Sequence, residues 1–253
     1  MSISNRELLD CLNSLLQPNK IKDFCPNGLQ IEGKTNINKV LTGVTASQAL
    51  IDQAVLEEAD AILVHHGYFW KGESSCLTGM KRKRIATLLA HNINLYAYHL
   101  PLDIHPEIGN NVQFAKLLEI VDVSPLEQGN PQSVVMQGRF LTPITPNELS
   151  ERLSLTLNRQ ALHESTNNSQ IKTVAWCTGG GQGYIELAAN NGIDAFITGE
   201  VSEQTIHVAR EMGIHFYAAG HHATERYGVK ALAEYIQQNL SIEAVFVDID
   251  NPA

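Results

Sequence analysis

The chain has 253 residues, of which 43% are hydrophobic and 18% are charged, and its formal net charge is -9. This length suits one large α/β domain or two small ones, and the apolar content is enough for a buried core. The negative charge argues against a nucleic acid as the main partner and against an anionic membrane surface.

Cysteine usage and the N-terminal residues indicate a cellular compartment. The four cysteines show no C-x-x-C spacing, which favours reduced thiols over a disulfide framework. Residues 1–10 lack the basic and then apolar pattern of a signal peptide. No apolar run approaches the roughly 18 residues needed to span a bilayer. We therefore expect a soluble, cytoplasmic protein without a membrane partner.

The first half of the chain alternates predicted helices and strands. Ser4 is a candidate N-cap, because Glu7 follows at the capping-box spacing, and Pro18 ends that helix. The continuous apolar run Ala61–Val64 predicts a strand buried on both faces of a parallel sheet. The other elements expected in this half are Leu29–Ile31, Lys39–Val44 and Asn94–His99 as strands, and Ser47–Glu58, Met80–His91 and Asn110–Leu118 as helices.

The second half repeats the first. Asp194–Glu200 lies 134 positions after Asp60–His66, so Gly199 and Glu200 fall on the two histidines at positions 65 and 66. The next strand, Ile214–Ala218, matches its counterpart in the first half with an offset of 121. The difference of 13 is an aromatic loop that the second copy lacks. Such an internal duplication predicts two halves related by a pseudo-twofold.

The predicted fold class is therefore α/β, with two pseudo-symmetric halves, each a mainly parallel sheet flanked by helices. Residues 1–126 would form the first half and residues 127–253 the second. Residues 124–132 are rich in turn-forming residues and are expected to link the halves. The sequence does not decide with which half the last predicted strand, Ala244–Asp248, pairs.

Three predicted strand ends carry side chains that bind metals. Because the carboxyl ends of parallel strands meet at one edge of a sheet, the repeat is expected to bring these groups towards one cleft. A mixed set of imidazoles and carboxylates suits Zn, Mn or Fe rather than Ca or Mg, and a bridging carboxylate allows two ions. Any one of these residues is also explained as a helix cap or turn residue. The clusters are His65 with His66, His99 with Asp103, and His221 and His222 with Glu225.

These motifs together resemble the Nif-type dinuclear-metal family, whose bacterial members are known as GTP cyclohydrolase 1 type 2 homologues. The matching segments are His65–Gly67, Tyr98–Asp103, Gly220–Glu225, Cys25–Gln30 and Cys177–Gln182. The resemblance covers the whole chain and implies a Nif-like fold, two divalent metal ions (Zn, Mn or Fe) and a toroidal homohexamer with its metal sites facing the interior. The metal ligands it implies are His65, His66, Asp103, His221 and Glu225, with His99 and His222 beside them.

The leading hypothesis is a hydrolase in which two ions activate a shared water against a small molecule, a nucleotide or another phosphate-bearing compound. The catalytic residues would be His99 and His222, one of which would move the proton. The family label implies opening of a purine ring, which residue spacing alone does not select over a phosphoester. The rival hypothesis is a non-catalytic metal-binding regulatory or assembly protein.

Three further segments each have two explanations. Gly179–Gly183 either holds a phosphate on its backbone amides or provides close backbone packing. Lys81–Arg84 is either a solvated helix face or a guide for anionic substrates. Tyr68–Trp70 either stacks a nucleobase or packs at a subunit contact.

Overall fold

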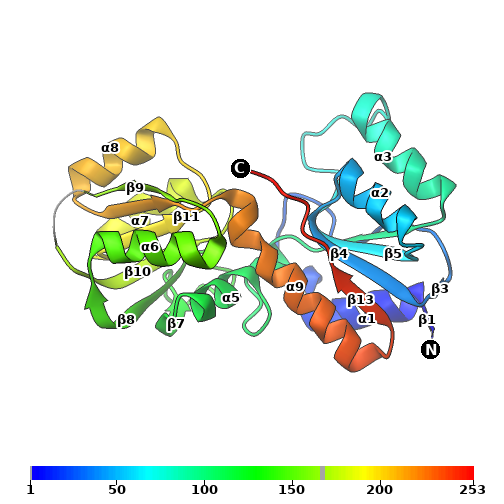
Figure 1. Cartoon of the computed structure of the whole chain (residues 1–253), viewed down its shortest axis with the longest axis horizontal. Coiled ribbons are helices and arrows are strands. Elements are labelled where there is room, and N and C mark those ends of the chain that lie inside the picture. The colour runs from blue at the N-terminus through cyan, green and yellow to red at the C-terminus, as the bar shows by residue number, and fades with distance from the viewer. Residues whose placement is uncertain (1, 166–168) are drawn as a thin grey trace. The chain divides into compact units, whose positions relative to one another are not determined.

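A computed structural model describes residues 2–165 and 169–253 of the chain (Figure 1). The chain folds into two units that are each discontinuous in sequence. Unit 1 comprises Met1–Ile108 and Gly228–Asp250, and unit 2 comprises Gly109–Tyr227 and Asn251–Ala253. The sequence instead suggested a division at residues 126 and 127. The C-terminal part of the second half differs from it because most of the long C-terminal helix, from Gly228 onwards, and the last strand pack within unit 1.

Unit 1 is built on a five-stranded sheet in the order β13-β4-β5-β6-β2. The first four strands in this order run parallel, and the edge strand β2 is antiparallel to β6. A small antiparallel pair, β1 and β3, lies outside this sheet. The strands of unit 1 are β1 (Ile3–Ser4), β2 (Gly28–Ile31), β3 (Asn36–Ile37), β4 (Lys39–Thr45), β5 (Ala61–His66), β6 (Asn94–Ala97) and β13 (Glu243–Phe246).

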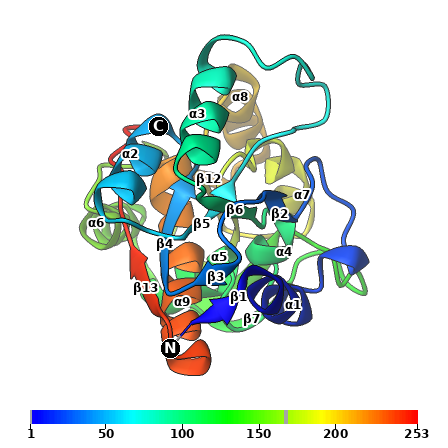
Figure 2. The same cartoon turned by 90° about the vertical axis from the view of Figure 1, so that its right-hand side faces the viewer.

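Helices cover both faces of this sheet, as Figure 2 shows. Alternate residues of β5 enter different cores: Ala61 and Leu63 pack with α1 and α9, whereas Ile62 and Val64 pack with α2 and α3. The continuous apolar run is thus explained by burial on both faces. The helices of unit 1 are α1 (Asn5–Leu16), η1 (Pro18–Lys20), α2 (Gln48–Leu56), α3 (Gly79–Ala90), α4 (Leu100–Asp103) and the part of α9 (His221–Leu240) that follows Tyr227.

The capping box predicted for the first helix is confirmed. The Ser4 hydroxyl accepts from the Glu7 amide, and the Glu7 carboxylate accepts from the Ser4 amide. Two amides at the helix N-terminus are thereby paired. The helix ends one residue before Gln17, which adopts the left-handed conformation.

Unit 2 is built on a six-stranded sheet in the order β7-β8-β10-β11-β12-β9. Only β10, β11 and β12 are parallel, and the other strands pair antiparallel at the two sides. The strands are β7 (Val121–Pro125), β8 (Met136–Ile144), β9 (Leu162–Glu164), β10 (Ile171–Cys177), β11 (Ala195–Thr198) and β12 (His215–Ala218). The helices are α5 (Asn110–Leu117), α6 (Pro146–Leu157), η2 (Gln182–Tyr184), α7 (Ile185–Asn190), α8 (Glu203–Met212) and the start of α9.

The duplication is visible in hydrogen bonds from backbone amides to an aspartate side chain at equivalent positions. In unit 1, the Asp60 carboxylate accepts from the amides of Asn38 and Lys39 at the start of β4. In unit 2, the Asp194 carboxylate accepts from the amides of Lys172 and Thr173, which lie 134 positions later. Each carboxylate therefore anchors the beginning of the strand next to its own.

The remaining sequence expectations are resolved by long-range strand pairing. The last strand, left open between the halves, pairs with β4 in unit 1. The first two residues of the predicted linker belong to a strand, because β7 pairs with β8 at Ser124 and Pro125. None of the helices within residues 2–165 and 169–253 combines the length and hydrophobicity that crossing a lipid bilayer requires.

Candidate metal centre

The end of β5 places His65 and His66 side by side in unit 1, with ring centroids 4.5 Å apart. His65 is fully buried, and its Nδ1 lies 3.0 Å from the carbonyl oxygen of Tyr98. A carbonyl only accepts hydrogen bonds, so Nδ1 carries the proton and Nε2 of the neutral ring carries the lone pair. The Nδ1 atom of His66 lies 3.2 Å from the hydroxyl of Thr45, the last residue of β4.

Asp103 is brought to His65 by the single turn of α4, which directly follows β6. Its Oδ1 lies 3.4 Å from His65 Nε2, and its side chain is 9% exposed. A buried carboxylate oxygen next to an imidazole lone pair is the arrangement in which both atoms bind one cation. Within unit 1, His65 is therefore next to both His66 and Asp103, three of the residues whose role as metal ligands stays a prediction.

His99 completes this cluster, because its potential ligand atom lies within 4.8 Å of those of His65 and His66. Its ring also contacts the indole of Trp70 edge-on, with centroids 4.9 Å apart. Sequence reasoning missed the partner of His99, which is Asp23: His99 Nδ1 lies 2.7 Å from Asp23 Oδ1. Burial raises the pKa of Asp23, but hydrogen bonds from His99, Asn27 and the Phe24 amide outweigh it and keep that pKa below its usual value.

In unit 2, His221 lies between two carboxylates at the start of α9. Its Nε2 lies 3.2 Å from Glu225 Oε2, one helical turn later, and its Nδ1 lies 2.7 Å from Glu200 Oε1. Burial lowers the pKa of His221, but the hydrogen bonds and charges of Glu225 and Glu200 together raise it to about 9. The two neighbouring carboxylates thus favour the protonated form of this imidazole. Glu200 stands at the repeat position of His66, but its role as the partner of His221 was not predicted.

The glycine loop of unit 2 is packed closely against this pair of residues. A Cβ on Gly179 would lie 2.0 Å from Glu225 Oε1 and 3.0 Å from His221 Nε2. The Gly179 amide already donates to the Thr224 hydroxyl, and the Gly181 amide donates to the Thr198 hydroxyl. Of the two explanations for the glycines, these contacts favour close backbone packing over a phosphate cradle.

The aromatic and basic segments of unit 1 are engaged in local contacts. Tyr68 is buried and donates to the Ala46 carbonyl, and Trp70 Nε1 donates to the Gly67 carbonyl. Lys81 lies over the ring of Phe69 and also contacts Ser74 and Glu73. Trp70 is thus a wall beside His99 and His66, while Phe69 is the exposed ring of the segment.

His222 is placed differently from the other histidines. It is largely buried on α9, and its backbone amide lies 3.3 Å from the carbonyl oxygen of Ala253. It does not appear in any group of three or more closely spaced ligand atoms within the described part of the chain. The catalytic role expected of His222 stays a prediction.

The residues present fit divalent metal ions by the chemistry of their donors. His65, His99 and His221 each direct Nδ1 at an oxygen that only accepts, which reserves Nε2 for another partner. Metal-binding histidines in proteins are usually held in this way, because the second hydrogen bond fixes the tautomer and the ring orientation. Unit 1 supplies two imidazoles and a carboxylate for such ions, and unit 2 supplies an imidazole and a carboxylate.

Relatives of known sequence and structure share this architecture. A 61% identical protein of Pasteurella multocida (strain Pm70), matched over 98% of both chains, is named GTP cyclohydrolase 1 type 2 homolog, and a 54% identical Escherichia coli (strain K12) protein has the same name. Among solved structures, protein ybgI, described as of unknown function, has a TM-score of 0.95 at 54% identity over 99% of this chain and 100% of its own. A second solved structure, that of TTHA1606 from Thermus thermophilus, has a TM-score of 0.89 at 33% identity, with 99% and 100% coverage.

These similarities confirm the predicted fold and the family resemblance. A family model described as Duf34/NIF3 (NGG1p interacting factor 3) matches residues 3–252, nearly the full chain. The motifs that carried the resemblance, including the histidine pair at the end of β5, all lie within that match. The chain belongs to the Duf34/NIF3 family.

Proposed function

We propose that this protein is a metal-dependent hydrolase that acts on a nucleotide or a related phosphate-bearing small molecule. Two divalent ions, Zn, Mn or Fe, would be held by five imidazole and carboxylate side chains. The proposed ligands are His65, His66, Asp103, His221 and Glu225. The single observation that carries the proposal is the buried pair formed by His65 Nε2 and Asp103 Oδ1, 3.4 Å apart, with His65 Nδ1 held by the Tyr98 carbonyl.

The donor set supports this choice of ions. Imidazole nitrogens combined with carboxylate oxygens suit Zn, Mn and Fe, whereas Ca and Mg prefer oxygen alone. Five protein ligands exceed the number of protein groups that a single catalytic zinc usually takes, so a pair of ions with a bridging carboxylate is the better fit. The ions would lower the pKa of a coordinated water and polarise the bond that is attacked.

The proposed proton-transfer residue is His99. Its ring lies 5.0 Å from that of His65 and 5.8 Å from that of His66, measured between centroids. Its Nδ1 is held by Asp23, so Nε2 is the atom that accepts a proton from the attacking water and returns it to the leaving group. His222, which neighbours His221 in sequence, is the second proposed residue for this step.

The substrate class is proposed from the names of the relatives. The curated proteins of Pasteurella multocida and Vibrio cholerae are both named as homologues of a GTP cyclohydrolase, which makes GTP and related nucleotides the first compounds to assay. We also propose that the protein is cytoplasmic, as its cysteine usage and N-terminal residues indicated. It would assemble as a toroidal homohexamer, as the sequence resemblance implied.

The test is an assay of the purified protein after metal reconstitution, with GTP and a panel of phosphoesters as substrates. The wild type should turn over one of these compounds. An Asp52→Asn control should keep this activity, because Asp52 is an exposed carboxylate on α2. Asp103→Asn should lose both bound metal and turnover. Stoichiometric metal without turnover of any compound would instead favour the rival hypothesis of a metal-binding assembly protein.

A further inference from the structure

The loop before β2 holds a carboxylate that is fixed by hydrogen bonds on both oxygens. The Asp23 side chain is only 3% exposed. Oδ1 accepts from the Phe24 amide at 2.6 Å and from His99 Nδ1 at 2.7 Å. Oδ2 accepts from Asn27 Nδ2 at 2.9 Å and from the Leu100 amide at 3.0 Å. Four donors on one buried carboxylate hold it in a single orientation.

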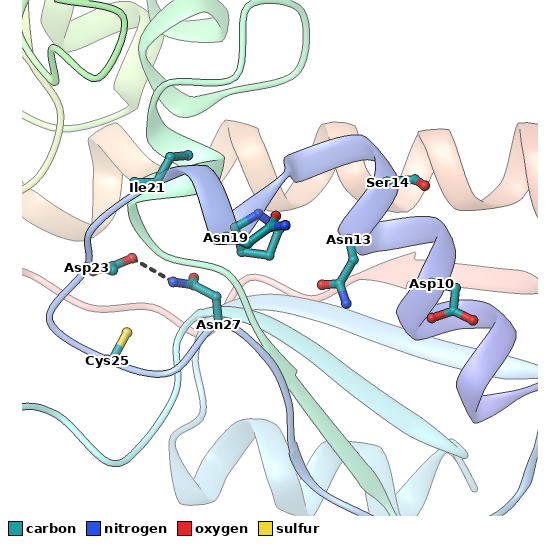
Figure 3. Close-up of a pocket in the computed structure, with 9 residues that line it drawn as sticks. Asp10, Asn13, Ser14, Asn19, Ile21, Asp23, Cys25 and Asn27 are labelled. Carbon is teal, nitrogen blue, oxygen red and sulfur yellow. Dashed lines mark hydrogen bonds between the residues drawn. The ribbon is translucent and has the colours of Figure 1, made fainter.

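Asn27 connects the carboxylate to the backbone of the same histidine. While its Nδ2 donates to Asp23, its Oδ1 accepts from the His99 amide at 2.7 Å. Asp23 and Asn27 therefore hold the backbone and the ring of His99 at once. Figure 3 shows Asp23 and Asn27 facing each other across the loop.

The outer side of this loop borders a cavity. Asp23, Cys25 and Asn27 form one wall of a pocket of about 810 Å³ whose other lining residues include Asp10 and Asn13 (Figure 3). This side of the loop faces the pocket. The orientation of the Asp23 carboxylate therefore depends on the four hydrogen-bond donors described above.

The hydrogen bond between Asp23 and His99 determines which ring nitrogen of His99 carries the proton. A carboxylate only accepts hydrogen bonds, so His99 must donate from Nδ1, and the neutral ring carries its lone pair on Nε2. The rings of His65, His66 and Trp70 surround that of His99.

We propose that Asp23, held by Asn27, is a positioning residue that fixes His99 in the Nδ1–H tautomer and presents its Nε2 as a proton acceptor. The second part rests on the proposed hydrolase function, in which the proton leaves the attacking water for Nε2 and then passes to the leaving group. In that step the nearby carboxylate stabilises the imidazolium that forms, without itself taking the proton. In this proposal Asp23 acts only through His99, with which its carboxylate is hydrogen-bonded.

The tautomer is measured directly on the full-length, metal-free protein labelled with ¹⁵N-histidine, by long-range ¹H–¹⁵N correlation. The His99 signals are assigned by their loss in His99→Gln. The wild type should show the Nδ1–H form. Asp23→Asn should lose the single Nδ1–H form, because the asparagine amide also donates. Asp10→Asn, which removes a carboxylate from the same pocket without contact to His99, should leave the tautomer unchanged.

This readout separates the inference from the proposed function. An Nε2–H tautomer in the wild type would overturn the positioning role even if Asp23→Asn failed to fold. In an active enzyme, Asp23→Asn should keep its metal content and its KM but lose kcat by about 10²- to 10⁴-fold. If no substrate is turned over, the proposed function fails while the tautomer still decides the role of Asp23. A changed tautomer with unchanged kcat would overturn the part assigned to His99 Nε2.

Discussion

At the scale of single residues, the same device recurs at three histidines. Nδ1 contacts the Tyr98 carbonyl in His65, the Asp23 carboxylate in His99 and the Glu200 carboxylate in His221. Such partners set the tautomer and raise the basicity of the nitrogen that binds a metal. The partners are therefore as much a part of the candidate centre as the ligands themselves.

The substitution Glu200→Gln tests this device in unit 2. Since Glu200 Oε1 lies 2.7 Å from His221 Nδ1, loss of the carboxylate should weaken metal binding by about 10- to 100-fold while the protein stays folded. Competition with a chromogenic chelator measures the affinity for Zn or Mn. Glu203→Gln, on an exposed side chain of α8, is the matched control and should bind as the wild type does. Equal affinities in the two variants would contradict a role for Glu200.

At the scale of elements, the glycine loop after β10 lies close to two of the proposed metal ligands. Gly179 has a φ of +69°, a conformation that side chains rarely adopt, and any Cβ there would meet Glu225 and His221. Gly183 in the same loop has open space around it. The two glycines therefore offer a matched pair of substitutions.

Gly179→Ala should destabilise the fold by about 1–3 kcal/mol, because the backbone is left-handed there, and it should also weaken metal binding by displacing Glu225. Gly183→Ala should be close to neutral in both respects. Denaturant unfolding and metal titration of the two variants provide the measurement. Normal metal binding by Gly179→Ala would show that the close approach of loop and carboxylate is not needed.

Asp60, at the start of β5, allows a pH test of an element boundary. Burial raises its pKa, but the Lys34 ammonium and the amides of Asn38 and Lys39 outweigh it and lower the pKa. A lowered folded-state pKa stabilises the fold above the unfolded value of about 3.9, and this stabilisation is lost as the pH falls through the folded value.

Asp60→Asn should therefore cost about 1–3 kcal/mol of stability near pH 7, where it leaves two backbone amides poorly paired. The gap in melting temperature between variant and wild type should narrow as the pH is lowered below about 4. The exposed Asp52→Asn serves as control. A gap that is constant with pH would contradict the charge of Asp60 as its origin.

Local elements could be predicted from the sequence, whereas their partners could not. The capping box of α1 and the strand before His65 are encoded within a few residues, and both are confirmed. The contact between Asp23 and His99 joins residues 76 positions apart, and no periodicity or motif announces such a pair. Glu200 was found as a repeat position, but its contact to His221 depends on the parallel pairing of β11 and β12, after which the two residues follow.

At the scale of the whole molecule, the internal repeat predicted two halves but not their boundaries. The carboxylates Asp60 and Asp194 anchor equivalent strands, as a duplicated unit should. The division itself is set by β13, which pairs Glu243 with Lys39 about two hundred positions earlier in the chain. A return of the last strand to the first unit leaves no signal in local sequence.

The proposed metal ligands in each unit predict that the stability of the protein depends on metal. A ligand that binds only the folded state adds about 2.7 kcal/mol at 100 times its Kd, which corresponds to roughly 5–10 °C in a chain of this size. A chelator should lower the melting temperature by this amount, and Zn or Mn should restore it. Asp103→Asn in unit 1 and Glu225→Gln in unit 2 should each blunt the response, whereas Glu203→Gln should not. If either variant showed the same shift in melting temperature as the wild type, the substituted residue would not be a metal ligand.

The most direct measurement is a crystal structure of the metal-reconstituted protein, with anomalous diffraction recorded at the absorption edge of the ion. We predict two anomalous peaks whose protein ligands are His65, His66, Asp103, His221 and Glu225, at bond lengths of about 2.0–2.3 Å. Peaks located on other residues, or bound by only some of these five side chains, would contradict the proposed set of metal ligands.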